Sequence, residues 1–208
     1  MLALLLSFAL QTSAQAPQTS KPSTRPHTNA QNCGPLFDDV LKCPRFGFTY
    51  KVTYGWVDRT GDMQEDPDES KAEPKKAGTG ETLLAVFERP PGAPSQTINS
   101  AVVIAAESLA DYHGIKQAAD YFGPITELAQ QRGFEVVNEP YAFNLDTKQL
   151  VRGDFSKERG KLTMWQSSLV MIEKGYIVSF TFVGGSEDEV QELIERLNFG
   201  TQPRRTPR

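Results

Sequence analysis

Hydrophobic and polar residues alternate in the first part of the chain as they do in β-strands. Phe48, Tyr50 and Val52 alternate with Thr49 and Lys51, and this period of two predicts a strand with one buried face. Two short apolar runs bounded by polar loops predict further strands at residues 83–87 and 101–106.

The period changes to that of a helix between residues 115 and 132. Apolar residues recur there at steps of three and four, at Ile115, Ala118, Ala119, Phe122, Ile125, Leu128 and Ala129. This spacing predicts an amphipathic helix that ends at Gly133. Gly123 and Pro124 interrupt the stretch, so we expect a kink, or two helical pieces that share one apolar face.

The rest of the chain predicts several strands and a closing helix. The strands are expected at residues 134–137, 141–145, 149–155, 162–172 and 176–183. Glu173, Lys174 and Gly175 have the composition of a hairpin turn between the last two. Ser186 stands three residues before Glu189, which is the spacing of a capping box. One helical apolar stripe follows, at Val190, Leu193, Ile194 and Leu197.

This order of elements predicts an α+β fold, with an antiparallel β-sheet flanked by helices. A length of 208 residues suits one domain with a sizeable core. We place that domain at residues 46–199, because the stretches 17–32 and 200–208 lack large apolar side chains and read as a disordered linker and a disordered tail. Residues 59–81 read as a long solvated loop.

The first sixteen residues have the composition of a secretory signal peptide. Residues 1–10 are apolar apart from Ser7, and small residues follow at Ser13, Ala14 and Ala16. The apolar run is shorter than the roughly 20 residues that a membrane-spanning helix needs. We therefore expect export to the periplasm or the exterior, with cleavage after Ala14 or Ala16 and no transmembrane span in the mature chain.

The two cysteines of the chain, Cys33 and Cys43, are close in sequence. In an oxidising compartment such a pair readily forms a disulfide, so we expect residues 33–45 to be an N-terminal segment closed by this bond, with a short helical turn inside it. A metal site is not expected, because two thiols with only His27 nearby do not complete a tetrahedral ligand set.

The charge pattern argues against nucleic acid as a partner. The chain carries 26 Asp and Glu residues against 22 Lys and Arg residues, and both signs are interspersed along the predicted domain. No basic face is therefore expected. Phosphate cofactors are not expected either, because Gly78-Thr79-Gly80 lacks the third glycine and the flanking elements of a dinucleotide loop.

Several segments together resemble the PsbP-like family, which includes a Ran-binding nuclear-import regulator and exported bacterial proteins. They are Phe46-Gly47-Phe48-Thr49-Tyr50-Lys51-Val52 with Gly55-Trp56, then Gly133-Phe134-Glu135-Val136-Val137, Gly175-Tyr176-Ile177-Val178-Ser179-Phe180 and Leu197-Asn198-Phe199. The resemblance covers residues 46–199 and implies an α/β/α sandwich around an antiparallel sheet. It does not imply a photosystem role, because the chain lacks the metal-handling residues expected of the photosystem subunit of this family.

No complete catalytic constellation is found along the sequence. Glu107, Asp111 and His113 form a grouping of acids with a histidine, but it lacks a nucleophile, and capping is the competing interpretation. Ser186 follows two glycines and is better explained as a helix N-cap than as a nucleophile. Arg152-Gly153-Asp154 spells an adhesion tripeptide, but it lies within a predicted strand.

Four residues are therefore candidates for binding: Asp111, His113, Trp56 and Trp165. The leading hypothesis is an exported, non-enzymatic protein that binds or helps assemble a macromolecule of the cell envelope. The alternative is a binder of a small apolar molecule or lipid, held between the sheet and the helix at residues 115–132. A hydrolase is the third hypothesis.

Overall fold

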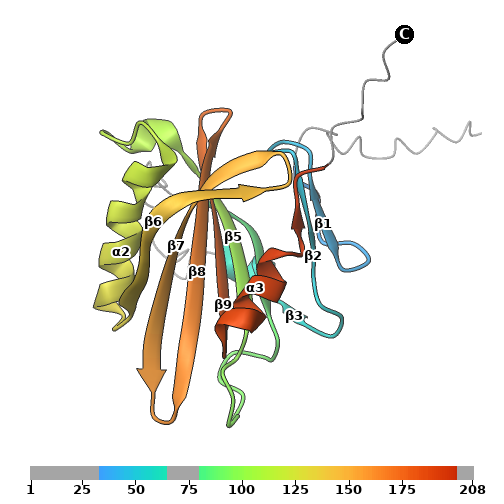
Figure 1. Cartoon of the computed structure of the whole chain (residues 1–208). Helices are drawn as coiled ribbons and strands as arrows, with labels where there is room; N and C mark the ends of the chain where they lie inside the picture. Colours follow the sequence, from blue (N-terminus) through green and yellow to red (C-terminus); the bar gives the residue numbers. More distant parts are fainter. Residues whose placement is uncertain (1–32, 65–79, 201–208) are drawn as a thin grey trace, which may run out of the picture.

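The computed structural model describes residues 33–64 and 80–200 (Figure 1). In chain order the elements are β1 (Val40–Cys43), β2 (Phe48–Lys51), β3 (Val57–Asp58), α1 (Thr60–Gln64), β4 (Glu81–Phe87), β5 (Ala101–Ser108), the 3₁₀ helices η1 (Leu109–Asp111) and η2 (Ala118–Tyr121), α2 (Phe122–Gln131), β6 (Glu135–Leu145), β7 (Lys148–Arg159), β8 (Leu162–Glu173), β9 (Tyr176–Gly184), α3 (Glu187–Ile194) and β10 (Leu197–Asn198).

A seven-stranded antiparallel sheet forms the centre of the fold. Its strand order is β3-β4-β5-β9-β8-β7-β6, so that β6 to β9 make a meander. The turn between β8 and β9 is closed by Lys174 and Gly175, both with positive φ, as the hairpin composition predicted. The expected α+β class with an antiparallel sheet is confirmed.

The strands expected at residues 134–137 and 141–145 are one strand, β6, at the edge of the sheet. Its pairing with β7 shifts between Val136 and Asn138 and again between Asn138 and Tyr141. Pro140 lies in this stretch, and an edge position accommodates it because the missing N–H removes no central hydrogen bond.

One face of the large sheet carries α2 and η2. Tyr121 and Phe122 are buried there against Val170 of β8 and Ile177 of β9. The expected pair of helical pieces is present, although the junction precedes Gly123 and Pro124. Pro124 stands in the first turn of α2, where its missing N–H has no helical partner to lose.

The opposite face carries α3 together with a small three-stranded sheet of order β1-β2-β10 (Figure 1). The main core lies between them, and its largest buried side chains include Tyr50, Phe180 and Phe182. Leu197, expected on the helical stripe, is buried but belongs to β10, where it pairs with Tyr50 of β2. The second covering layer thus combines the helix α3 with the small sheet.

The segment at residues 33–45 is part of this core. Cys33 and Cys43 form the expected disulfide. The helical turn expected between them is wrong: Asp38 and Asp39 have φ of 49° and 57°, and a tight turn places Phe37 opposite Val40 at the start of β1. Asp tolerates this left-handed conformation, which two-residue hairpins require.

Leu41 and Cys43 of β1 are fully buried in the main core. A domain boundary at residue 46 therefore cuts between two paired strands, β1 and β2. The predicted signal peptide and linker lie outside the described residues, as do positions 201–208 of the predicted tail and 65–79 of the predicted loop. The start of that loop is helical, in α1. None of the helices in the described part of the chain is long and apolar enough to cross a membrane.

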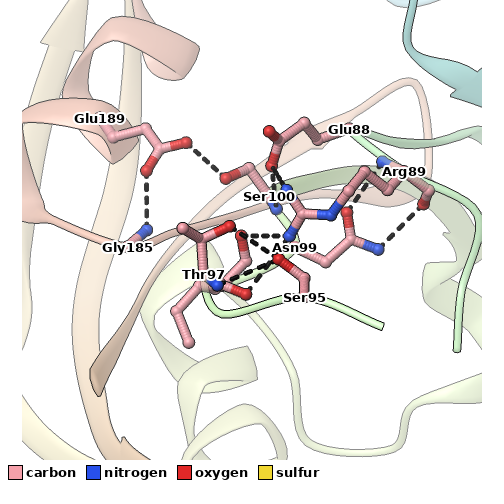
Figure 2. A network of polar contacts seen from close by, with 9 residues as sticks. Glu88, Arg89, Ser95, Thr97, Asn99, Ser100, Gly185 and Glu189 are labelled. Carbon is pink, nitrogen blue, oxygen red and sulfur yellow. Dashed lines mark hydrogen bonds and ion pairs between the residues drawn. The ribbon is translucent and has the colours of Figure 1, made fainter. Parts of the chain in front are cut away.

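The N-terminus of α3 is fixed to the sheet by a polar network (Figure 2). Ser186 caps the helix, as predicted, by accepting a hydrogen bond from the Glu189 amide at 3.1 Å. The Glu189 carboxylate accepts from the amide of Gly185 at 2.8 Å and from the buried hydroxyl of Ser100. The loop before Ser100 is closed by reciprocal bonds of 2.9 Å between the backbone of Arg89 and the Asn99 side chain.

Candidate functional site

A cavity of about 110 Å³ lies on the α3 face of the sheet, where β6, β7 and β8 meet the first turns of α3. Its lining combines aromatic, aliphatic and polar side chains from these elements: Val137, Asn138, Tyr141, Arg152, Asp154, Trp165, Gln166, Ser167, Glu187 and Val190. We refer to it as the α3 cavity.

A buried ion pair forms the base of the α3 cavity. Arg152 and Asp154 are two residues apart on β7, so both side chains point to the same face of the sheet. The Arg152 Nε atom donates to Asp154 Oδ1 at 2.7 Å, and the two side chains are only 13% and 9% exposed. Burial of both ions is favourable only when their remaining hydrogen bonds are made.

Arg152 makes those bonds with its neighbours. Its Nη1 donates to Gln191 of α3 at 2.9 Å and its Nη2 donates to Ser167 of β8 at 3.1 Å. The guanidinium also lies over the ring of Phe143 of β6, 5.2 Å from the ring centre. Arg152 therefore ties together β6, β8 and α3.

Asp154 is engaged through both of its oxygens. Oδ1 accepts from Arg152 and from the Ser167 hydroxyl, while Oδ2 accepts from Asn138 Nδ2 at 3.1 Å and from the Tyr141 hydroxyl at 3.4 Å. Partial burial raises the pKa of Tyr141; the charge of Arg152 opposes this rise and Asp154 adds to it. The Tyr141 phenol is thus a neutral donor at the rim of the cavity.

This arrangement is suited to binding. Ser167 donates to a carboxylate that is already paired with Arg152, and a serine nucleophile needs instead a base that can take its proton. None of the cavity residues is a histidine. Within residues 33–64 and 80–200, no three His, Cys, Asp or Glu side chains gather as a metal site would require.

The rim of the α3 cavity exposes apolar surface. Val137 and Tyr141 of β6 are 41% and 40% exposed, and Trp165 of β8 is partly buried against the main core. Large side chains of this kind beside a buried arginine match the composition of protein–protein contact sites.

Of the four candidate binding residues from the sequence, Trp165 alone lines the α3 cavity. Trp56 packs against the main core and does not line this cavity. Asp111 ends η1 and His113 follows it, and both side chains are exposed. Their proposed grouping with Glu107 as an acid/base set stays a prediction.

Glu107 has a different set of neighbours. Its carboxylate accepts hydrogen bonds from Tyr112, at 2.6 Å, and from Tyr121. Burial and these bonds to Glu107 raise the pKa of both phenols. The cluster joins η1 and η2 to the end of β5. Glu107 therefore has a structural role.

Sequence reasoning missed Arg152 and Asp154 as site residues. The tripeptide they belong to lies within a strand, as the sequence predicts. The available signal was the strand itself: opposite charges two residues apart, on the same face as the buried Leu150, indicate an ion pair at the core boundary.

The space between the sheet and α2, where the alternative hypothesis places an apolar ligand, is filled at its centre by Phe122. This ring is 2% exposed. It approaches the backbone of Gly153 so closely that a Cβ added there would lie 2.6 Å from the ring. No ligand volume remains at this contact.

Comparisons with known proteins find similarity among solved structures alone. No family model matches the chain, and no curated protein matches it. Similar solved structures include PsbP from Synechocystis sp. PCC 6803, with 15% identity and a TM-score of 0.44 over 80% of this chain and 96% of that chain. The Ran-binding protein Mog1p from Saccharomyces cerevisiae has 12% identity and a TM-score of 0.40, over 74% and 91% of the two chains.

A third similar structure is LpqN of Mycobacterium tuberculosis, which is described as involved in cell envelope biogenesis. It has 12% identity and a TM-score of 0.35, over 72% of this chain and 76% of that chain. PsbP and a Ran-binding protein are both kinds of protein named in the PsbP-like resemblance of the sequence. With TM-scores below 0.5, these similarities carry no further argument.

Proposed function

We propose that the protein is an exported, non-enzymatic binding protein that attaches to another protein of the cell envelope through the α3 cavity. The observation that carries this proposal is the composition of the cavity. The polar groups at its base are hydrogen-bonded to one another, while Val137, Tyr141 and Trp165 offer large apolar groups.

The size of the α3 cavity favours part of a protein over a free ligand. Sites for drug-sized molecules usually enclose roughly 300–1,000 Å³, and this cavity has about 110 Å³. A single side chain inserted from a partner fits that scale, and such anchors supply most of the binding energy in protein interfaces.

The edge strand β6 limits how a partner approaches. A partner strand that extended the sheet at β6 would need an uninterrupted row of backbone donors and acceptors. Pro140 and the two register shifts interrupt that row. Contact through side chains at the α3 cavity is therefore the favoured mode.

Two observations support export. Residues 1–16 have the composition of a signal peptide, and a disulfide joins Cys33 to Cys43, as is common in oxidising compartments and rare in the cytosol. Mass spectrometry of the protein from its native compartment is the direct measurement. A mature chain that begins near residue 15 or 17 is the expected result, and an intact Met1 with both thiols free contradicts export.

Affinity capture from envelope extract tests the binding role. Val137→Lys places a positive charge on the rim of the cavity, and Leu128→Lys places one on an exposed leucine of α2, which makes it the matched control. We expect one protein to be captured by the wild type and by Leu128→Lys, and to be lost with Val137→Lys. Equal capture by all three overturns the role of the cavity.

Native mass spectrometry of the purified protein addresses the lipid-binding alternative. A stoichiometric lipid adduct, together with no partner in the capture experiment, would contradict the proposed function. An adduct-free protein agrees with the packing of Phe122 against Gly153, which fills the space between sheet and helix.

A further inference from the structure

We infer that the α3 cavity accepts the cationic end of a lysine or arginine side chain from a basic segment of the partner protein. This inference rests on the proposed function and specifies the chemistry of its partner. Three features of the cavity support it: the aromatic residues that line it, the pairing of Arg152 with Asp154, and the negative charge of the helix beside it.

Aromatic side chains contribute to the walls of the α3 cavity. Trp165 comes from β8 and Tyr141 from β6, and both line the same space. The face of an aromatic ring attracts an ammonium or guanidinium group, and the attraction is largest for tryptophan and in desolvated sites. A long side chain of this kind also buries its methylene groups against apolar residues such as Val137 and Val190.

Arg152 does not make the cavity a site for anions. Each of its three guanidinium nitrogens already donates to a neighbour: Nε to Asp154, Nη1 to Gln191 and Nη2 to Ser167. Its charge is balanced by Asp154 at 2.7 Å. An incoming carboxylate would therefore meet a guanidinium that Asp154 already neutralises.

The remaining charge of the cavity is negative. Besides Arg152 and Asp154, Glu187 of α3 is the one Asp, Glu, Lys, Arg or His among the lining residues. Its carboxylate is exposed and makes no hydrogen bond or ion pair with any residue of the described ranges. A cation that enters the cavity therefore meets an unpaired carboxylate.

The acidic residues of α3 add to the negative charge of the cavity. The helix α3 contains Glu187, Asp188, Glu189 and Glu192 and no basic residue. Acidic residues in a first helical turn also stabilise the helix, so these carboxylates alone would not identify a ligand. Together with the aromatic residues that line the cavity, they make it complementary to a basic side chain in charge and in the types of its lining residues.

Titration of the full-length protein with short peptides tests the inference. The probes are acetylated tripeptide amides, Gly-X-Gly, in which X is lysine, arginine, norleucine or glutamate. The readout is the NMR signal of the Trp165 indole N–H, assigned by its persistence in Trp56→Phe. We expect the lysine and arginine peptides to shift this signal with saturation, and the norleucine and glutamate peptides to bind at least several-fold more weakly.

Two variants test whether the carboxylate of Glu187 binds the cationic group. Glu187→Gln should weaken the binding of the lysine peptide by several-fold, and Glu192→Gln, which removes a charge from the same helix outside the cavity, should change it by less than twofold. Equal effects of the two variants, equal binding of the norleucine peptide, or preference for the glutamate peptide each overturn the inference.

The outcomes separate this inference from the proposed function. If capture of a partner depends on Val137 while neither basic peptide shifts the Trp165 signal, the binding role stands and the cationic occupant is wrong. If the basic peptides bind and dependence on Glu187 is seen, but capture does not depend on Val137, the chemistry of the cavity stands and its proposed partner contact is wrong.

Discussion

The ring of Phe122 in α2 lies directly over the backbone of Gly153 in β7. A Cβ atom added at Gly153 would stand 2.6 Å from Phe122 Cε1, far inside van der Waals contact. Because Phe122 is buried and cannot move freely, Gly153→Ala should destabilise the protein by about 1–3 kcal/mol, the usual cost of overpacking. Urea unfolding of the two proteins measures this difference.

Gly123→Ala in α2 is the matched control. A Cβ there meets nothing within 4 Å, and alanine is a better helix former than glycine by roughly 0.5–1 kcal/mol. It should therefore leave the stability unchanged or raise it. If Gly153→Ala behaves in the same way, α2 does not pack on β7 as described.

The buried pair of Arg152 and Asp154 predicts strong losses from single substitutions. Asp154→Leu leaves the Arg152 charge buried without its counter-ion, and Arg152→Met does the same to Asp154. Removal of one partner of a buried ion pair typically costs about 3–5 kcal/mol. Thermal or denaturant unfolding of each single variant should show a loss of this order.

The double variant, Arg152→Met with Asp154→Leu, should recover much of that loss, because no buried charge is then left unpaired. Losses that simply add in the double variant would show that the two side chains do not interact. The double-mutant cycle thus measures the coupling free energy of the pair directly.

Local signals account for the elements that the sequence predicted correctly. Ser186 caps α3 through a bond to a residue only three positions away, and Lys174 and Gly175 close a hairpin between adjacent strands. Each of these depends on neighbours in the chain, so a pattern of a few residues is enough to predict it.

The features that the sequence did not predict depend on contacts between segments that are far apart in the chain. Leu197 continues the helical stripe in sequence, but pairing with Tyr50 places it in a strand. The α3 cavity likewise exists only where Asn138, Asp154 and Trp165 from three strands meet Glu187 of α3. The alternation within β7 predicts that Arg152 and Asp154 share a face, but no local pattern shows which groups surround them.

The raised pKa values of the buried tyrosines predict a loss of stability at alkaline pH. Burial, hydrogen bonding to Glu107 and the nearby Tyr112 raise the pKa of Tyr121 above its ordinary value of 10.0. At higher pH the unfolded chain releases the phenolic proton while the folded chain retains it. The free energy of unfolding therefore falls as the pH rises above about 10.

Tyr121→Phe should make this fall less steep, because it removes one of the groups responsible. Tyr54→Phe, at a tyrosine that is 91% exposed, serves as the control and should leave the pH dependence unchanged. The measurement is urea unfolding at several pH values between about 9 and 11. An unchanged dependence in Tyr121→Phe would contradict the cluster around Glu107.

The Cys33–Cys43 disulfide predicts a moderate effect of reduction. The bond joins residues ten positions apart, and closing a loop of this length removes on the order of 3 kcal/mol of chain entropy from the unfolded state. A Cys33→Ser, Cys43→Ser variant should thus melt at a lower temperature with its sheet intact by circular dichroism. An unchanged melting temperature would indicate that the bond does not form in solution.

Removal of residues 1–45 should be far more damaging than loss of the disulfide. The truncation takes away β1, and with it Leu41 and Cys43, both fully buried, and the pairing that covers one edge of β2. Loss of a buried leucine alone costs about 2–5 kcal/mol, which is comparable to the stability of many domains. We therefore expect residues 46–208 to melt without cooperativity or to aggregate, whereas residues 33–208 melt cooperatively. A cooperative melt of the shorter chain would restore the domain boundary at residue 46 and show that β1 is dispensable for the core.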